Sequence, residues 1–189
     1  MHQIFDDQTF EKYDSAIGLN HEFTDCVFKN SDFHDMTVQG GEFTDCSFVS
    51  CNLATVRFEN TVMGKVLFRD CKIIGVDFGK CSKYSFSVEF ENCTLNYSSF
   101  YKNDLRKSRF ANCMMHEMSF TETNLTEAKF LDCDLYKTIF DRANLEKTDF
   151  TTAINYTINP EINHLKRTKF SMSGIAGLLS HLDIILSDH

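Results

Sequence analysis

The stretch FTDCVFKNSDF, residues 23–33, decides the fold because its phenylalanines recur every five residues. Phe23, Phe28 and Phe33 fit neither the 3.6-residue period of a helix nor the two-residue period of a strand. The letters FTDC return unchanged at residues 43–46. A sustained period that matches no single element indicates a repeat architecture.

The five-residue register extends through most of the chain and is apolar at every step. It slips by two residues between residues 79 and 87 and then resumes at Phe90. Its members are Phe23, Phe28, Phe33, Val38, Phe43, Phe48, Leu53, Phe58, Met63, Phe68, Ile73, Phe78, Phe90, Leu95, Phe100, Leu105, Phe110, Met115, Phe120, Leu125, Phe130, Leu135, Phe140, Leu145 and Phe150.

A second inward position lies two residues before each of these and carries small or unbranched residues without charge. Two inward groups two residues apart indicate a short strand, after which the chain must bend to keep the next pair inside. A longer period of 20 residues separates Cys51 from Cys71, Cys93 from Cys113, and Cys113 from Cys133. Twenty residues make four five-residue units, so four bends would close one square coil.

The ends of the chain depart from the pattern. We expect an N-terminal cap over residues 1–20, repeats over 21–153 and a C-terminal segment over 154–189. In SGIAGLLSHL the helical spacing of Ile175, Leu178, Leu179 and Leu182 predicts a short helix, with Ser173 as its N-cap. A solenoid needs its last coil covered, so this segment is a cap, and it is also a candidate dimer seam.

The units TNLTE, ANLEK, CDLYK and NDLRK resemble the A-(D/N)-L-x-x pattern of the pentapeptide repeat proteins. That resemblance implies an all-β fold, a right-handed quadrilateral β-helix of about six coils and about 30 Å in length. The tail segments INYTINPEIN, LKRTKFS and GLLSHLDIILSD, together with CKIIGVDF and FENCTLNYSSFY, are similar to the topoisomerase-protecting branch of the family. This branch contains albicidin-resistance, microcin-immunity and Qnr-type quinolone-resistance proteins. The similarity implies a homodimer joined through the C-termini and a DNA mimic that binds DNA gyrase or topoisomerase IV and relieves a topoisomerase poison. It implies no cofactor.

The net charge of −8 arises entirely in the first 48 residues, because the remainder carries as many acids as bases. An acidic surface argues against direct binding to nucleic acid and suits a basic partner. Glu22 should lie one coil below Glu42, and Asp25 one coil below Asp45, where like charges repel. A solvated surface that keeps the rod soluble would show the same charges. The candidate partner-binding acids are Glu22, Asp25, Asp32, Asp35, Glu42 and Asp45.

Other classes of site find little support in the sequence. The cysteines follow the inward register, and a column of thiols does not converge on one point as zinc ligands must, so we expect no metal site. The chain contains no G-x-S-x-G, P-loop or H-E-x-x-H motif, which predicts that it is not an enzyme. No stretch resembles a secretory signal or a membrane span, so we expect a cytoplasmic protein. A general interaction scaffold with another protein partner remains the alternative function.

Overall fold

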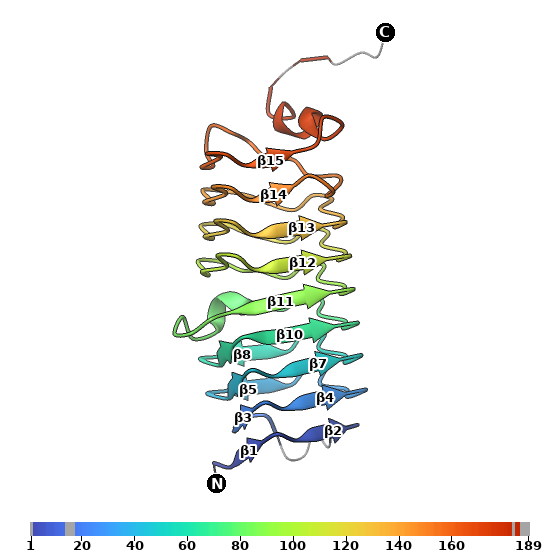
Figure 1. The fold of residues 1–189 in the computed structure, drawn as a ribbon, viewed down its shortest axis with the longest axis vertical. Helices are drawn as coiled ribbons and strands as arrows, with labels where there is room; N and C mark the ends of the chain where they lie inside the picture. Colours follow the sequence, from blue (N-terminus) through green and yellow to red (C-terminus); the bar gives the residue numbers. More distant parts are fainter. Residues whose placement is uncertain (1, 14–17, 183, 186–189) are drawn as a thin grey trace.

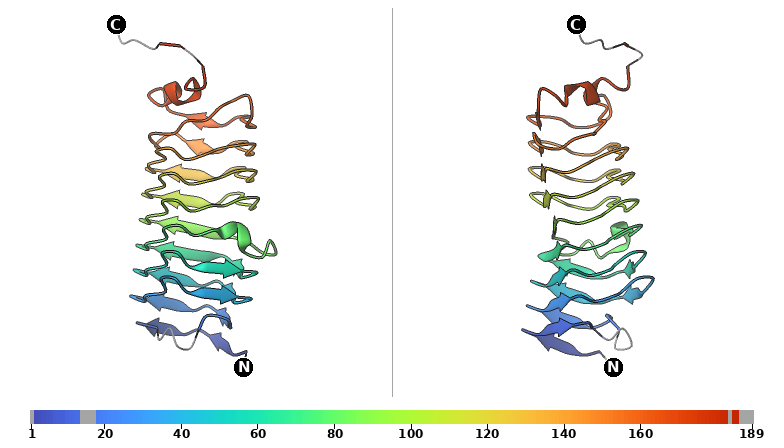
Figure 2. Two further views of the ribbon diagram at one scale, coloured as in Figure 1. Left: turned by 180° about the vertical axis from the view of Figure 1, so that it is seen from behind. Right: turned by 90° about the vertical axis from the view of Figure 1, so that its right-hand side faces the viewer.

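The structure, a computed structural model, describes residues 2–13, 18–182 and 184–185. These residues form a long rod of stacked coils, with strand β1 (Ile4–Asp6) near one end and β15 (Lys169–Phe170) near the other (Figure 1). Every strand pair is parallel and in register with the coil above and below. The views in Figure 2 show the same regular stacking from the back and the side. The prediction of an all-β parallel solenoid is confirmed.

Strands form continuous sheets on some sides of the rod and single bridges on the others. On the first side, β1 is followed by β3 (Glu22–Thr24), β6 (Glu42–Thr44) and β9 (Val62–Gly64). The second side is a nine-stranded sheet in the order β15, β14 (Asp149–Phe150), β13 (Lys129–Leu131), β12 (Arg109–Ala111), β11 (Val88–Glu91), β10 (Val66–Arg69), β7 (Ser47–Val49), β4 (Val27–Lys29) and β2 (Thr9–Glu11).

The third side is linked by single bridges such as Asp32–Asn52 and Asn52–Lys72. The fourth side carries β5 (Thr37–Gln39) and β8 (Arg57–Glu59).

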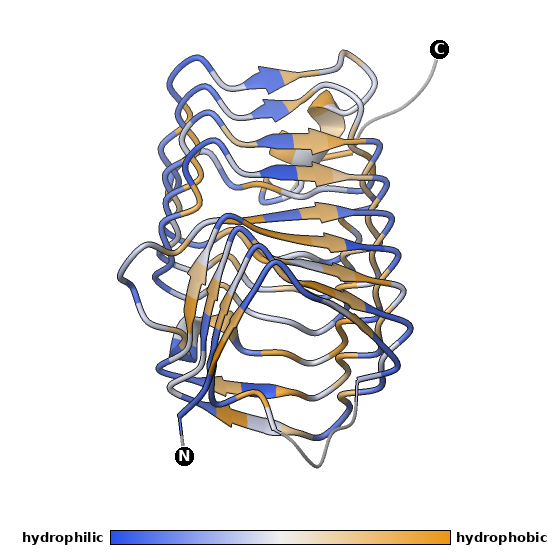
Figure 3. Cartoon of the chain, turned by 60° about the horizontal axis from the view of Figure 1, so that its bottom comes forward, coloured by the Kyte–Doolittle hydropathy of each residue, from blue (hydrophilic) through white to orange (hydrophobic). Residues whose placement is uncertain are grey.

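The corners between sides explain why five residues make one unit. Two or three residues of a unit extend along one side of the rod, as a strand or a single bridge, and a residue with positive φ then turns the chain, as at Asp25 (φ 50°) and Lys107 (φ 64°). Residues other than glycine adopt this left-handed region rarely, and Asp and Asn tolerate it best. Corner side chains point away from the core, so they are polar, and Figure 3 shows hydrophilic residues at the corners.

The core is a set of side-chain columns that run the length of the rod. Phe28 and Phe48 stack with ring centroids 4.7 Å apart, and Phe110 and Phe130 stack at 4.9 Å. Rings on neighbouring sides meet edge to face, as Phe110 and Phe120 do at 5.9 Å. Both arrangements are favourable for aromatic pairs. All members of the five-residue register are buried.

The coil begins earlier and ends later than the sequence pattern suggested. Phe5 pairs with Phe23 and Phe10 with Phe28, so β1 and β2 complete a first coil inside the expected N-terminal cap. This coil is shorter than the others, and the buried Tyr13 fills it and donates from its hydroxyl to the Gly18 carbonyl at 2.8 Å. With β15 at the other end, the longest sheet has nine strands instead of the expected six or so coils.

The register slip is a bulge on the first side of the rod. Strands β10 and β11 pair Val66 with Val88, which places two extra residues between them. The Ser82 amide donates to the Thr61 carbonyl at 2.9 Å and the Ser87 amide to the Met63 carbonyl at 2.7 Å. Between these bonds the chain bulges outwards, and the first-side sheet stops at β9. A short 3-10 helix, η2 (Phe78–Lys80), precedes the bulge.

The C-terminal cap is held by a buried tyrosine. Tyr156 packs its ring 5.7 Å from Phe150 and 5.6 Å from Phe170. The helix above it, η3 (Ile175–Leu178), approaches so closely that a Cβ at Gly174 or Gly177 would collide with Tyr156.

The predicted C-terminal helix is therefore shorter and tighter than a continuous α-helical stripe. It is a four-residue 3-10 helix whose N-cap is Gly174, not Ser173. Beyond this helix, Ile184 and Ile185 form no strand.

Candidate protein interface

Acidic side chains gather on the first side of the rod near its N-terminal end. Glu22 and Glu42 are paired neighbours on the parallel strands β3 and β6, as predicted. Asp25 and Asp45 occupy successive corners beside them, and Asp45 forms an ion pair with Lys65 at 3.1 Å. Within the described residues, Glu22, Asp25 and Glu42 have no ion pair. The stacked carboxylates are thus available to a cationic partner.

The first coil enlarges this surface with two acids that lie within the expected N-terminal cap. Asp6 and Asp7 lie in and beside β1, and Asp7 continues the corner column because its amide donates to the Thr24 carbonyl at 3.1 Å. Both are exposed. The signal that could have revealed them is the five-residue spacing of Phe5 and Phe10. We call Asp6, Asp7, Glu22, Asp25, Glu42 and Asp45 the acidic surface.

The other two predicted acids do not belong to this surface. Asp32 lies on the third side, opposite β3, and Asp35 occupies the corner beyond it. Asp32 accepts hydrogen bonds from the His34 amide at 3.2 Å and from the Asn52 amide side chain at 2.9 Å. The bonds from His34, above all from its backbone amide, lower the pKa of Asp32. Asp35 accepts a hydrogen bond from the Thr55 hydroxyl. Their interactions are local and structural.

The acidic surface suits binding better than chemistry. Its carboxylates stand on an open face at the strand spacing of about 4.8 Å, and Glu42 and Asp45 also border an open hollow beside them. General acid–base catalysis needs a group held against a substrate in a cleft. A regular ladder of negative charge instead attracts a positively charged surface.

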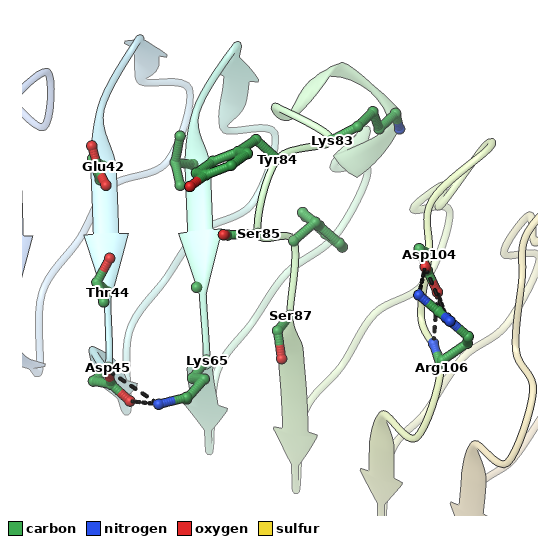
Figure 4. A pocket seen from close by; sticks show the side chains of 13 residues that line it. Glu42, Thr44, Asp45, Lys65, Lys83, Tyr84, Ser85, Ser87, Asp104 and Arg106 are labelled. Carbon is green, nitrogen blue, oxygen red and sulfur yellow. Dashed lines mark hydrogen bonds and ion pairs between the residues drawn. The ribbon is translucent and has the colours of Figure 1, made fainter.

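A hollow of about 690 Å³ lies beside the bulge, on the same side of the rod. Figure 4 shows Tyr84 over the strand that leads to Lys65, next to the strand of Glu42 and Thr44, and Asp104 and Arg106 on a separate segment beyond Ser85 and Ser87. Arg106 pairs with Asp104 at 2.7 Å.

The hollow has exposed and partly buried groups in its wall. Tyr84 is 76% exposed, and burial lowers the pKa of Lys83. The sequence revealed only the slip in register here, because the shape depends on where the extra residues leave the coil.

Toward the C-terminal end, basic side chains gather at the corner between the first and second sides and on the neighbouring strands β13 and β15. Five of them line a second hollow of about 580 Å³ together with Glu127 and Asp149. Lys147 pairs with Glu127 at 3.0 Å, while Lys107 and Arg167 have no ion pair within the described residues. The sequence does not reveal this stretch, because charges from distant units come together only in the folded coil. The five cations are Lys107, Lys129, Lys147, Arg167 and Lys169.

The cysteines are core residues. All eight are free thiols and buried. Cys46 donates to the Phe23 carbonyl at 3.3 Å, and burial raises its pKa to about 12. Burial also raises the pKa of Cys81 to about 12. Among the described residues, no three His, Cys, Asp or Glu side chains are grouped so that they could hold a metal ion.

Apolar side chains are exposed at the C-terminal end. Leu178 packs against the core, whereas Ile175 is 47% and Leu182 43% exposed. Leu179 is half-buried. Met172 and Ile185 are also exposed. The four residues of the predicted stripe therefore do not form one buried face. Leu178 packs onto the core, whereas Ile175 and Leu182 are exposed. No helix in the described part of the chain is long and apolar enough to span a membrane.

Comparison with known proteins agrees with the geometry. The description "Pentapeptide repeat region" matches residues 21–85 and 84–156. Two solved structures of trypsin-treated variants of QnrB1, described as a plasmid-mediated fluoroquinolone resistance protein, each align with a TM-score of 0.50 at 19% identity. The first alignment covers 98% of both chains and the second 100%. HetL from Nostoc, described as involved in heterocyst differentiation regulation, aligns with a TM-score of 0.41 at 11% identity over 87% of this chain and 84% of HetL. No curated protein matched the sequence. The chain belongs to the pentapeptide repeat family, and it shares the fold of a Qnr protein.

Proposed function

We propose that this protein is a non-enzymatic scaffold that binds a type II topoisomerase, DNA gyrase or topoisomerase IV, and relieves it of a poison. The observation that carries the proposal is the stacking of like charges on one side: Glu22 on Glu42, and Asp7, Asp25 and Asp45 in one column. Such stacking costs stability, which favours a role in recognition. The resemblance of the C-terminal segment to topoisomerase-protecting proteins supports the choice of partner.

The acidic surface imitates only part of a DNA duplex. Duplex DNA carries one negative charge per ~1.7 Å of axis, whereas one column of corner residues offers one per ~4.8 Å. With a net charge of −8 concentrated near one end, the protein can occupy part of a cationic DNA-binding surface. It therefore competes locally with DNA instead of replacing a whole duplex.

The exposed apolar residues near the C-terminus support a dimer through that end. Ile175 and Leu182 would be covered by a second copy. Size-exclusion chromatography with light scattering in 0.5 M NaCl, where contacts between exposed charges are screened, tests this step: Ile175→Asp with Leu182→Asp should yield monomers. A dimer that survives both changes at this salt concentration would contradict a seam at these residues.

A supercoiling assay with purified gyrase and relaxed plasmid tests the main proposal. The protein should restore supercoiling in the presence of a fluoroquinolone or albicidin. Lysine substitutions at Glu22, Asp25, Glu42 and Asp45 should abolish the recovery, because they invert the acidic surface. Lysine at Asp32 and Asp35 is the matched control, since those acids lie on another side and should not matter.

The second candidate function is an interaction scaffold for a different cationic protein. It is favoured by the position of the acidic surface at one end of the rod. No recovery with gyrase or topoisomerase IV at a many-fold molar excess would exclude the first function and leave this one.

A further inference from the structure

One corner of the rod reverses its charge along its length. This corner joins the first and second sides, and we call its residues the charged edge. All but Ser87 have a left-handed backbone, and all but the half-buried Glu127 are exposed. In coil order they are Asp7, Asp25, Asp45, Lys65, Ser87, Lys107, Glu127, Lys147 and Arg167.

We propose that the charged edge and the adjoining first side form an interface between two antiparallel copies of this chain. When two rods lie side by side in opposite directions, a twofold axis between the coils of Ser87 and Lys107 sets the register. Asp25 then lies opposite Arg167, and Asp45 lies opposite Lys147. Lys65 lies opposite Glu127. Twofold symmetry makes each of these pairs twice, as in any isologous interface.

This register places three oppositely charged pairs opposite each other along the edge and no like-charged pair. Sliding one rod by one coil, which moves the axis half a coil toward the N-terminus, places Asp45 opposite Glu127 and Lys65 opposite Lys107. The opposite shift places Lys65 opposite Lys147. A parallel arrangement in register places every charge opposite itself. Like charges brought together at an interface disfavour the neighbouring registers, so the edge favours the arrangement with three opposite pairs.

The first side adds agreement in charge and in shape. In the same register Glu22 lies opposite His164 on the partner rod, and its neighbour Thr24 lies opposite Lys166. The exposed Tyr84 on the bulge faces the coil of Asp104 and Arg106 of the second copy. That coil and the chain's own bulge both border the hollow of about 690 Å³, so the hollow lies within the proposed interface (Figure 4).

The interface covers part of the acidic surface. Asp25 and Asp45 pair with the second copy, so self-association competes with any cationic partner of those residues. Because the contacts are exposed charges, added salt weakens them. This inference does not depend on the proposed function, since it concerns only the protein by itself.

A charge swap tests the pairing directly. Asp25 and Arg167 suit it because neither has an ion pair in the described part of its own chain. Sedimentation velocity at low ionic strength should show association of the natural protein that 0.5 M NaCl weakens. Asp25→Arg alone and Arg167→Asp alone should each weaken association at least about tenfold, because each reversal creates two like-charge contacts. The double variant should recover it, because both partners are then exchanged.

Each single variant has a matched control at a left-handed corner away from the interface. These are Asp35→Arg and Lys137→Asp, which should leave association unchanged. All measurements are repeated with Ile175→Asp and Leu182→Asp in the chain, so that association through the C-terminus does not contribute. If the chain that carries only Ile175→Asp and Leu182→Asp stays monomeric, the proposal is overturned. A double charge-swap variant that fails to recover association would overturn it as well.

Carbodiimide crosslinking of mixed ¹⁴N- and ¹⁵N-labelled protein provides a readout independent of mutation. A crosslink of mixed isotopes between Asp45 and Lys147 is expected. The pair Asp45–Lys65 should crosslink within one chain only, with a single isotope. Mixed-isotope crosslinks that join other residues and never the charged edge would place the interface elsewhere.

Discussion

The column of corner aspartates predicts that removing one charge stabilises the protein. Asp25 lies between Asp7 and Asp45 along the charged edge and has no ion pair within the described residues. Asp25→Asn keeps the shape of the side chain, and Asn also tolerates the left-handed backbone at φ 50°. The change therefore removes two repulsions with little other effect.

The magnitude follows from the spacing of the coils. Two exposed carboxylates at the coil spacing of ~4.8 Å repel by ~0.9 kcal/mol in water, and salt reduces this to roughly half. Relief from two neighbours should therefore raise the free energy of unfolding by about 0.9 kcal/mol at moderate ionic strength. Asp45→Asn is the matched control, because Asp45 repels Asp25 but attracts Lys65 at 3.1 Å. In Asp45→Asn the repulsion that is lost and the attraction that is lost nearly cancel, so the free energy of unfolding should hardly change.

Urea denaturation followed by circular dichroism measures both variants. The urea midpoint of Asp25→Asn should lie above that of the natural protein and of Asp45→Asn. The gain should vanish in 1 M NaCl, where the screening length is about 3 Å. A destabilised Asp25→Asn, or equal midpoints for both variants, would refute the view that the column is held together against its own repulsion.

Further predictions concern the core and the titrating groups. Phe110→Ala should lower the free energy of unfolding by about 4 kcal/mol, because Phe110 is fully buried between Phe90 and Phe130. Phe110→Leu should lower it by only about 1 kcal/mol. Equal losses for the two variants in urea denaturation would contradict the stacked column. Cys46 and Cys81 should resist alkylation by iodoacetamide at pH 8 until urea unfolds the chain, because burial raises the pKa of each thiol to about 12. Alkylation of either cysteine in the native protein, detected by mass spectrometry, would refute this prediction. Burial opposes ionisation of Asp134, but hydrogen bonds from Asn155 and His116 outweigh it and lower its pKa, so its contribution to stability is present above pH 4 and disappears as the pH falls through the lowered value. The gap in thermal midpoint between the natural protein and Asp134→Asn should accordingly shrink between pH 5 and pH 3, and a constant gap would exclude the ionised carboxylate as its cause.

The candidate site was only partly visible in the sequence. The pairing of Glu22 with Glu42 was predicted, because a coil of fixed length places residues one repeat apart in contact. The grouping of Asp32 and Asp35 with them was not supported, because successive units turn to different sides of the rod. Asp6 and Asp7 were missed because Phe5 and Phe10 are separated from the main register by the short first coil.

The sequence by itself determined the repeat, the parallel coil and the burial of its apolar columns. The physical reason is that a five-residue period contains the strand and its corner, so local pattern and packing agree at every unit. Only the tertiary structure decided where the coil starts and ends, how Gly174 and Gly177 let the cap close over Tyr156, and how the two extra residues form the bulge and its hollow. It alone decided the sides on which the charges gather, because the short first coil and the bulge change the number of residues per turn. The charged edge, whose ends lie far apart in the sequence, exists only once the coils are stacked.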